Sequence, residues 1–433
     1  MMMTAVSAAM TAQQPALQEP DEQPADPADY KFRFGGYGEM VAAFKDYGTN
    51  RYYGSKTGNT KDNRATISIP RFVLAFDYKF TPKWVLSAEI EFEAGGTGSE
   101  VELENSENGE WETEVEQGGE VALEQFHITY TFCRWLSVRA GHVIIPVSLT
   151  NEHHEPIFFF GTVRPEGETT IIPSTWHETG LELFGDIGSG AASFDYRLQV
   201  VTGLNVDGFD RNEWVKGGKQ GLFEDDNFSS PAWVARLNYN GVQDLRIGAS
   251  FYHVNDVTKN ADKTYKYSDV GKSGINIWSA DAQYMNEYVT FRFNVLGGLL
   301  HHADKITGVV SKLSNNSPYS RTGAIAKRAL AYGGEAGLNV GALINHFPVI
   351  YPFVRYEYYN SQESGAGMTT MDKRCQVSMW TWGLNWFALP NLVFKVDYTN
   401  REIGTSKVFG EGKYTGENEF AIGIAYIGWF TKD

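Results

Sequence analysis

Charged side chains stand at every second position within otherwise apolar stretches of this sequence. In residues 71–80, Arg71, Asp77 and Lys79 share one set of alternating positions, and the other set is Phe72, Leu74, Phe76, Tyr78 and Phe80. Alternate residues of an extended chain point to opposite sides. A charge in an apolar core costs several kcal/mol unless it is paired, whereas in a water-filled interior it costs little. The spacing therefore indicates side chains that meet ions in a wet interior, and not the centre of a covalent reaction.

Two adjacent histidines offer a second kind of chemistry, metal binding. His153 and His154 are flanked by Glu152 and Glu155 in the sequence. Adjacent residues of an extended segment point apart, so one metal ion would rarely bind both histidines. The acidic residues 95–120 could bind calcium, but a solvated acidic loop explains them better. We predict no metal and no other cofactor.

Motifs of nucleotide-binding and hydrolytic enzymes do not occur in the sequence. It has no P-loop, no dinucleotide-binding glycine pattern and no G-x-S-x-G nucleophile motif. Serine, histidine and aspartate are present, but no spacing assembles them into a triad. The sequence therefore predicts a protein that is not an enzyme.

Extended elements are needed to hold the charged positions on one face. Strand patterns recur along the whole chain, and no run of about 18 apolar residues could form a transmembrane helix. Aromatic residues make up 14% of the chain, yet its mean hydropathy is negative, as expected when half of each strand faces water. The predicted strands are 31–44, 67–80, 83–94, 121–133, 135–143, 176–186, 192–204, 232–240, 244–254, 274–286, 288–300, 329–343, 349–359, 376–388, 391–400 and 417–430.

The connections between these strands alternate in length. Long polar connections are predicted at 45–66, 95–120, 144–175, 205–231, 255–273, 301–328, 360–375 and 401–416, with short ones between them. A transmembrane barrel has this rhythm, with short periplasmic turns and long extracellular loops, and an even strand count returns both chain ends to one side. The predicted fold class is therefore all-β, a transmembrane antiparallel β-barrel of about 16 strands.

The N-terminal residues differ in composition from the rest. Residues 1–29 contain a small-residue segment ending in "AMTA", which is typical of a signal-peptide cleavage region, followed by an acidic, proline-rich leader. We predict that 1–29 is a signal-peptide remnant and leader, and that 30–433 is the barrel. Residues 1–29 and 95–120 together hold 14 of the 16 net negative charges. The overall charge therefore does not predict which ions the interior would prefer.

The long connection 144–175 and the strand after it carry a recognisable pattern, "EPIFFFGTVRPEGETTIIPSTWHETGLELFG". The elements "RPE" and "IIPSTWHETG" resemble the phosphate-selective porin O and P family, in its Bacteroidota-type branch. The resemblance implies an outer-membrane barrel of sixteen strands, a homotrimer, and a third extracellular loop, here 144–175, that folds inward and narrows the pore. Arg164, Glu166 and Glu168 are the charged candidates of this constriction loop.

Strand alternation assigns the remaining charged residues to the interior. The predicted pore-lining cations are Arg33, Arg71, Lys79, Arg139, Arg197, Arg236, Arg246, Arg292, Arg355 and Lys395. Carboxylates fall on the same face: Glu39, Asp77, Glu89, Glu91, Glu182, Asp195, Asp281, Glu357 and Asp397. Rings of arginine and lysine favour anions. Two roles stay open, because the arginines either select anions or pair with these carboxylates and brace the wall.

The leading hypothesis is an outer-membrane porin through which small hydrophilic solutes diffuse passively, with an anion or phosphate bias. Its partners would be outer-membrane lipid and lipopolysaccharide, small solutes or anions, and two further copies of the chain, and not nucleic acid. One alternative is an accessory or structural barrel with a plugged lumen, docking lipoproteins or other envelope machinery. Another is an outer-membrane hydrolase. The two cysteines, Cys133 and Cys375, are predicted at opposite rims and therefore as free thiols.

Overall fold

The computed structural model describes residues 30–47, 63–96, 100–105, 111–116, 120–221, 225–310, 324–367, 371–404 and 416–432. The predicted signal remnant and leader at 1–29 lie outside the described residues. The strands are β1 (Phe32–Lys45), β2 (Arg64–Ser68), β3 (Arg71–Thr81), β4 (Trp84–Glu93), β5 (Glu100–Asn105), β6 (Trp111–Glu116), β7 (Glu120–Cys133), β8 (Leu136–Ile144), β9 (His177–Ile187), β10 (Phe194–Val201), β11 (Ala232–Val242), β12 (Leu245–Val254), β13 (Ile275–Met285), β14 (Val289–Leu300), β15 (Arg328–Leu338), β16 (Val349–Ser364), β17 (Gln376–Leu389), β18 (Leu392–Ile403) and β19 (Gly416–Lys432).

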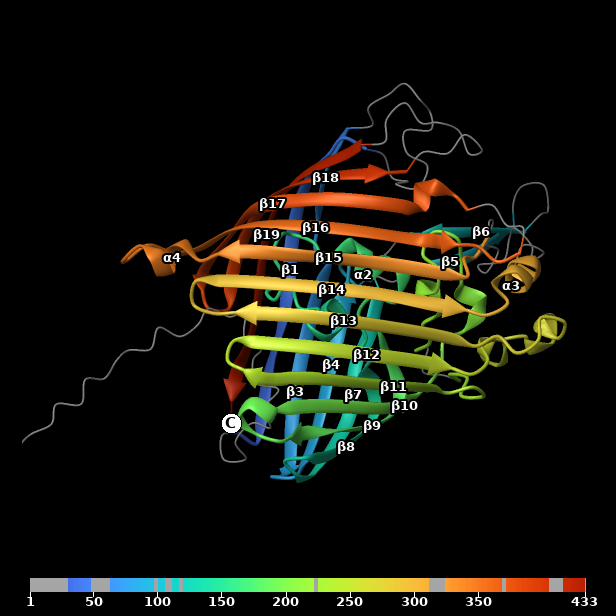
Figure 1. Cartoon of the computed structure of the whole chain (residues 1–433), viewed down its shortest axis with the longest axis horizontal. Helices are drawn as coiled ribbons and strands as arrows, with labels where there is room; N and C mark the ends of the chain where they lie inside the picture. The colour runs from blue at the N-terminus through green and yellow to red at the C-terminus, as the bar shows by residue number, and fades with distance from the viewer. Residues whose placement is uncertain are drawn as a thin grey trace, which may run out of the picture.

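These strands close into an antiparallel barrel (Figure 1). Each wall strand pairs with the next one along the chain, from β3 to β19, and β19 returns to pair with β1. Both β2 and β3 pair with β1, so together they form one strand of the wall, interrupted at Ile69 and Pro70. Proline has no N–H to donate to a neighbouring strand. The predicted fold, a closed barrel of 16 wall strands, is confirmed.

Three details of the strand prediction are wrong. The strand predicted at 67–80 is two strands, for the reason just given. The strand predicted at 329–343 ends at Leu338, because the Asn339 side chain bonds to the carbonyl of Glu287 and the chain then turns into the short helix α4 (Val340–Leu343). The connection 95–120 was predicted without strands but contains the separate hairpin β5–β6.

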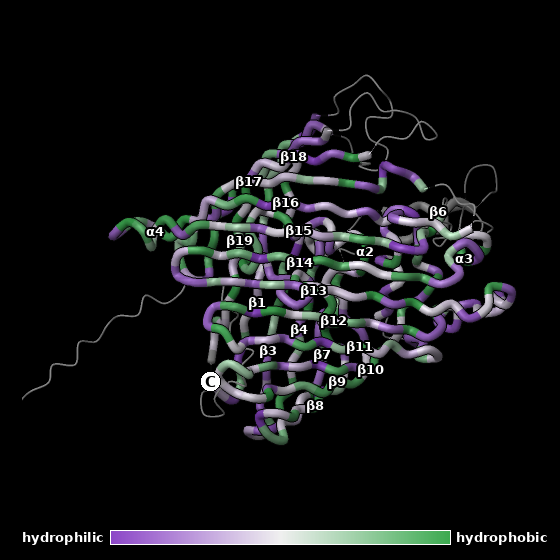
Figure 2. The backbone as a smooth tube through the Cα atoms, in the orientation of Figure 1, coloured by the Kyte–Doolittle hydropathy of each residue, from purple (hydrophilic) through white to green (hydrophobic). Residues whose placement is uncertain are grey.

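The exterior of the barrel is apolar and its interior is polar. On β17, Trp380, Trp382 and Trp386 are more than 40% exposed, whereas the alternating Thr381 and Asn385 are buried. Figure 2 shows the same alternation of hydrophobic and hydrophilic residues along the strands. An apolar outer face around a polar interior is the arrangement of an outer-membrane barrel, whose outside meets lipid. The chain is therefore an outer-membrane β-barrel.

The helices are short and lie in the connections. They are α1 (Leu149–Glu152), α2 (Glu166–Ile171), α3 (Ala303–Val310) and α4, with the 3-10 turns η1 (Gly190–Ala192), η2 (Val206–Gly208), η3 (Lys216–Gly218), η4 (Val257–Asn260), η5 (Thr264–Tyr267) and η6 (Lys373–Cys375). Among the described residues, no helix has the length and hydrophobicity needed to span a bilayer. Figure 1 places α3 and the β5–β6 hairpin at one end of the barrel, and α4 and the C-terminus at the other.

The long connections pack on one another instead of standing apart in solvent. One hydrophobic cluster joins Trp176, Trp214, Tyr267 and Ile306, which come from four different connections or their borders with strands, and each is at most 3% exposed. The Trp214 indole also donates to the carbonyl of Ala326 at 2.9 Å. The loops at this end therefore form a packed layer with its own core.

Candidate functional site

Residues 145–176 run along the inner face of the wall. Their backbone N–H groups donate to inward side chains of widely separated strands: Ser148 to Ser279 on β13 at 3.0 Å, and Thr162 to Asp397 on β18 at 2.7 Å. On the opposite side, Arg71 of β3 donates to the carbonyl of His154 at 2.7 Å. We call residues 145–176 the inner loop. Figure 1 shows its helix α2 behind the front strands of the barrel.

Two wall cations fix the middle of the inner loop. The Lys395 ammonium donates to the carbonyls of Phe159 at 3.1 Å and Gly161 at 2.7 Å, and also contacts the carbonyl of Pro156. Arg355 donates to the carbonyl of Val163 at 2.9 Å. Backbone carbonyls that face away from water need such donors. These two predicted pore-lining residues therefore hold the loop, and both are buried.

The ten predicted pore-lining cations separate into two groups by burial. The buried ones are Arg71, Lys79, Arg236, Arg292, Arg355 and Lys395, and the partly exposed ones are Arg33, Arg139, Arg197 and Arg246. Pairs with a carboxylate of the described residues, at N–O distances from 2.6 to 3.9 Å, are formed by Arg33, Arg71, Arg139, Arg197, Arg236, Arg246, Arg292 and Arg355. Lys395 binds loop carbonyls, and Lys79 lies 3.7 Å from the centre of the Tyr30 ring. The structure therefore shows the pairing that the bracing hypothesis requires, and the pore-lining role stays a prediction.

The Glu152 carboxylate of the inner loop contacts three arginines. Glu152 lies 2.8 Å from Arg236, 2.9 Å from Arg246 and 3.9 Å from Arg197, which stand on the consecutive strands β11, β12 and β10. Arg236 also contacts Asp281 on β13 at 2.8 Å. Glu152 thus links three neighbouring strands through their arginines. The sequence analysis considered Glu152 only as a neighbour of His153. Its contacts with the arginines could not be predicted, because the residues around Glu152 in the sequence do not show which strands its side chain will reach.

The partly exposed pairs present their cations to water more than their anions. The arginine and carboxylate side chains are 17% and 10% exposed in Arg33–Asp77, and 20% and 1% in Arg139–Glu182. Arg197 and Arg246 are 11% and 17% exposed, against 1% for Glu152. In the pair of Arg401 with Glu166 the order is reversed, because the side chains are 1% and 20% exposed.

The three predicted constriction residues do not form one charged group. Arg164 donates to Thr175 within the loop at 2.8 Å. The Glu166 carboxylate accepts from Arg401 at 3.0 Å, and Glu168 accepts from the N–H of Thr150 at 2.8 Å. Arg164 is thus not paired with the glutamates that follow it in the sequence, because the turn into α2 directs them toward different partners. Whether these residues line a constriction stays a prediction.

The two adjacent histidines have different partners, as predicted, but they follow directly on helix α1 and are not part of an extended segment. His153 contacts Arg246 and lies 3.8 Å from Glu152, whereas the His154 Nε2 atom lies 2.8 Å from Glu124 on β7. Glu124 and Gln125 are consecutive residues of β7, yet both side chains face inward, because the register between β4 and β7 shifts at this point.

Both cysteines are free thiols, as predicted. Cys133 ends β7 at a short turn and is partly exposed, whereas Cys375 is buried in η6 among loop residues. Burial raises the pKa of the Cys375 thiol to about 11. Its thiolate is therefore scarce at neutral pH.

Comparison with known proteins is informative about the fold. No family model matches the chain. A protein of Aquifex aeolicus (strain VF5), described only as an uncharacterized protein, is 26% identical over 385 residues, covering 86% of this chain and 76% of that protein. The resemblance to the O and P porin family therefore stays a prediction.

Solved structures of outer-membrane channels share the barrel. An anion-selective porin from Comamonas acidovorans has a TM-score of 0.53 and 9% identity, with 92% of this chain and 99% of that chain covered. OmpF of Salmonella typhi in complex with daunomycin has a TM-score of 0.55 and 11% identity, with 92% and 98% covered. The channel DcaP of Acinetobacter baumannii has a TM-score of 0.54 and 10% identity, with 92% and 97% covered. At these identities the similarity shows the fold of outer-membrane porins.

Proposed function

We propose that the chain is an outer-membrane porin through which small hydrophilic solutes diffuse passively, with a preference for anions. The observation that carries the anion preference is the exposure of the wall pairs. In the pairs of Arg33, Arg139, Arg197 and Arg246, the arginine side chain is more exposed than its carboxylate partner. In a narrow pore with low-dielectric walls, such fixed charges act on passing ions more strongly than in open water.

The arrangement around Glu152 supports the same preference. Arg197 and Arg236 stand directly opposite each other on β10 and β11, and Arg246 follows on β12. All three contact Glu152, and Arg236 also contacts Asp281, so three guanidinium groups gather on this part of the wall. Phosphate is the anion that the family resemblance suggests, and guanidinium groups bind phosphate oxygens well.

The accessory-barrel alternative has its own supporting observation. Arg71, Arg355 and Lys395 bind the inner loop and are at most 3% exposed, so the loop occupies interior space beside them. A barrel whose loop filled the whole lumen would hold its shape but conduct no ions. Conductance of the purified protein in a planar bilayer distinguishes the two functions.

Selectivity is tested by reversal potentials in a salt gradient. We expect the wild-type protein to conduct and to favour chloride or phosphate over potassium. Arg197→Glu and Arg139→Glu should each move the reversal potential toward cation preference. Lys263→Glu, which makes the same charge change at an exposed position of the loop between β12 and β13, serves as the matched control and should leave it in place.

The bracing hypothesis predicts a different outcome for the same variants. If the arginines only hold the wall, Arg197→Glu and Arg139→Glu lower thermal stability and leave the reversal potential unchanged. Cation preference of the wild type would refute the anion preference but not the porin function. No conductance at all would favour the accessory barrel.

We also propose, from the family resemblance, that the porin is a homotrimer surrounded by outer-membrane lipid and lipopolysaccharide. The mass of the protein–detergent complex, corrected for bound detergent, tests this. A mass corresponding to one chain would contradict it.

A further inference from the structure

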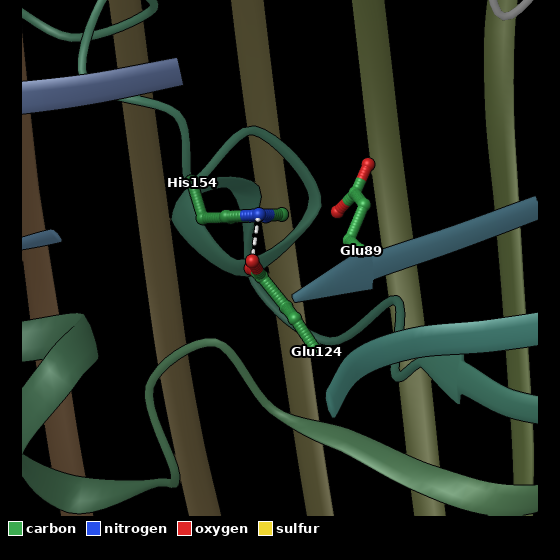
Figure 3. A group of neighbouring side chains, drawn as sticks. All are labelled: Glu89, Glu124 and His154. Carbon is green, nitrogen blue, oxygen red and sulfur yellow. Dashed lines mark ion pairs between the residues drawn. The ribbon is translucent and has the colours of Figure 1, made fainter. Parts of the chain in front are cut away.

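Three potential metal ligands converge where the inner loop meets the wall. Glu89 of β4, Glu124 of β7 and His154 of the inner loop each place a ligand atom so that all three atoms lie within 4.8 Å of one another (Figure 3). Bonds of about 2.1 Å from a central ion place neighbouring ligand atoms roughly 3–4 Å apart. The three groups are therefore close enough to share one ion after small rotations.

A β-bulge brings Glu124 into this cluster. Glu89 pairs with Gln125, but the next residue, Ile90, pairs with Leu123, so Glu124 is an extra residue on β7. A bulge leaves the extra residue out of the strand pairing and redirects its side chain, which is why bulges are common beside binding sites. Without this bulge Glu124 would face lipid, where a carboxylate is costly.

Neighbouring groups orient each of the three ligands. Tyr37 donates to both oxygens of Glu124, at 2.8 and 2.9 Å, and Gln125 donates to one oxygen of Glu89 at 2.8 Å. The His154 Nδ1 atom lies 3.3 Å from the carbonyl oxygen of Asn151, which can act only as a hydrogen-bond acceptor. This contact holds the proton on Nδ1 and turns Nε2 toward the carboxylates. Metal-binding histidines are commonly oriented in this way.

The Nε2 atom of His154 is the nitrogen that would bind a metal ion. His154 is only 3% exposed, and within the described part of the chain its Nε2 forms no aligned hydrogen bond, although a Glu124 oxygen lies 2.8 Å away. The Glu124 oxygen is the partner of this nitrogen in the structure, and a metal ion bound by both groups would replace that contact. In Figure 3 the imidazole lies beside the Glu124 carboxylate, with Glu89 nearby.

The local charge also favours a cation. Arg71 donates to the carbonyl of His154 at 2.7 Å and also contacts Glu39 at 3.5 Å and Glu91 at 3.8 Å. One imidazole thus faces several carboxylates. Glu89 is only partly buried, which leaves an approach from the interior.

We propose that Glu89, Glu124 and His154 bind one divalent first-row transition-metal ion, which ties the inner loop to the wall. An imidazole nitrogen with two carboxylates suits zinc, manganese or iron(II), whereas calcium and magnesium prefer oxygen ligands alone. Because His154 lies on the loop and the carboxylates lie on adjacent strands, the ion bridges parts of the fold that the chain does not connect locally.

Zinc binding to the full-length chain tests the proposal. The protein is refolded in detergent, treated with a chelator, dialysed, and titrated with Zn²⁺ in a calorimeter. We expect one equivalent to bind and the thermal unfolding midpoint to rise. His154→Ala and Glu89→Gln should each weaken binding at least about tenfold, and Tyr37→Phe, which removes only an orienting hydroxyl, by about tenfold or more.

Two histidine variants serve as controls. His153→Ala, next in the sequence but directed toward Arg246, and His346→Ala, exposed at a short turn, should leave zinc affinity unchanged. Loss of affinity in either control to the same degree as in His154→Ala would overturn the proposal, as would no zinc binding by the wild type. If His154→Ala does not fold, Glu89→Gln and Tyr37→Phe, which preserve side-chain size, decide the question.

Discussion

The carboxylate of Glu152 is the group whose removal should change both ion selectivity and stability. Glu152→Gln nearly preserves the volume of this side chain, at the end of α1, and removes one negative charge from among Arg197, Arg236 and Arg246. Asp281 would still contact Arg236. The local charge becomes more positive by one unit.

The effect on selectivity can be worked out from this charge. One unit charge acting on an ion about 10 Å away through water contributes about 0.4 kcal/mol, which is roughly a factor of two in local concentration. The factor is opposite for anions and cations, so their permeability ratio changes about fourfold at low salt. At 0.1 M salt, where the Debye length is about 10 Å, the change falls to about twofold.

The effect on stability depends mainly on Arg236, because this pair is almost completely buried. The side chains of Arg236 and Glu152 are 0% and 1% exposed. Removing one partner of a buried pair costs about 3–5 kcal/mol, and we expect the lower end because Asp281 remains. The pairs with Arg197 and Arg246 are partly exposed, so each adds at most about 1 kcal/mol.

Two measurements on Glu152→Gln test this reasoning. The reversal potential in a potassium chloride gradient should move toward anions, more at low salt, and the free energy of unfolding in lipid vesicles should fall by about 3 kcal/mol. Glu287→Gln, at an exposed turn, should change neither. A reversal potential that stays in place or moves toward cations would refute the idea that the arginines act on passing ions. Unchanged stability would refute the role of Glu152 in holding the loop.

Two further predictions concern other parts of the barrel. Maleimide should label Cys133 quickly and Cys375 slowly at pH 8. Cys375 is buried, and a thiol with a pKa of about 11 is ionised to only about one part in a thousand at that pH. Mass spectrometry of the labelled peptides measures the two rates, and equal rates would contradict the buried position of Cys375. Gly337→Ala should lower the free energy of unfolding by about 1–3 kcal/mol, because a Cβ atom there would lie 2.4 Å from the Phe160 ring of the inner loop. Unfolding in guanidinium measures this change. A variant as stable as the wild type would show that the Phe160 ring moves aside freely.

The barrel itself could be predicted from the sequence because its signal is local. Trp380, Trp382 and Trp386 alternate with smaller or polar residues, and this alternation decides which face meets lipid. The rhythm of short and long connections then decides that neighbours in sequence are neighbours in the wall. Neither inference needs a contact between distant residues.

The candidate sites could be predicted only in part, because they depend on contacts between residues distant in the sequence and on how deeply each side chain is buried. Alternation places Arg71 and Arg139 on the inner face, but it does not show that Arg71 is buried under the inner loop while Arg139 reaches water. The bulge that turns Glu124 inward has no clear local signal, and one extra residue reverses the face assigned by counting. The partners of the inner loop lie as much as 239 residues away in the sequence.

That separation along the chain has a consequence for how the barrel is assembled. The inner loop follows β8, but Lys395 and Asp397, which bind its middle segment, stand on β18, the penultimate strand. Until β18 joins the wall, the carbonyl of Phe159 and the N–H of Thr162 have no lasting partner there. This segment of the loop is therefore fully bound only when β18 is in place, next to β19, which closes the ring against β1. Earlier strands already contact other parts of the loop, through Arg71 of β3, Ser279 of β13 and Arg355 of β16. A chain interrupted before β18 would therefore lack both the closed ring and the last contacts of the loop.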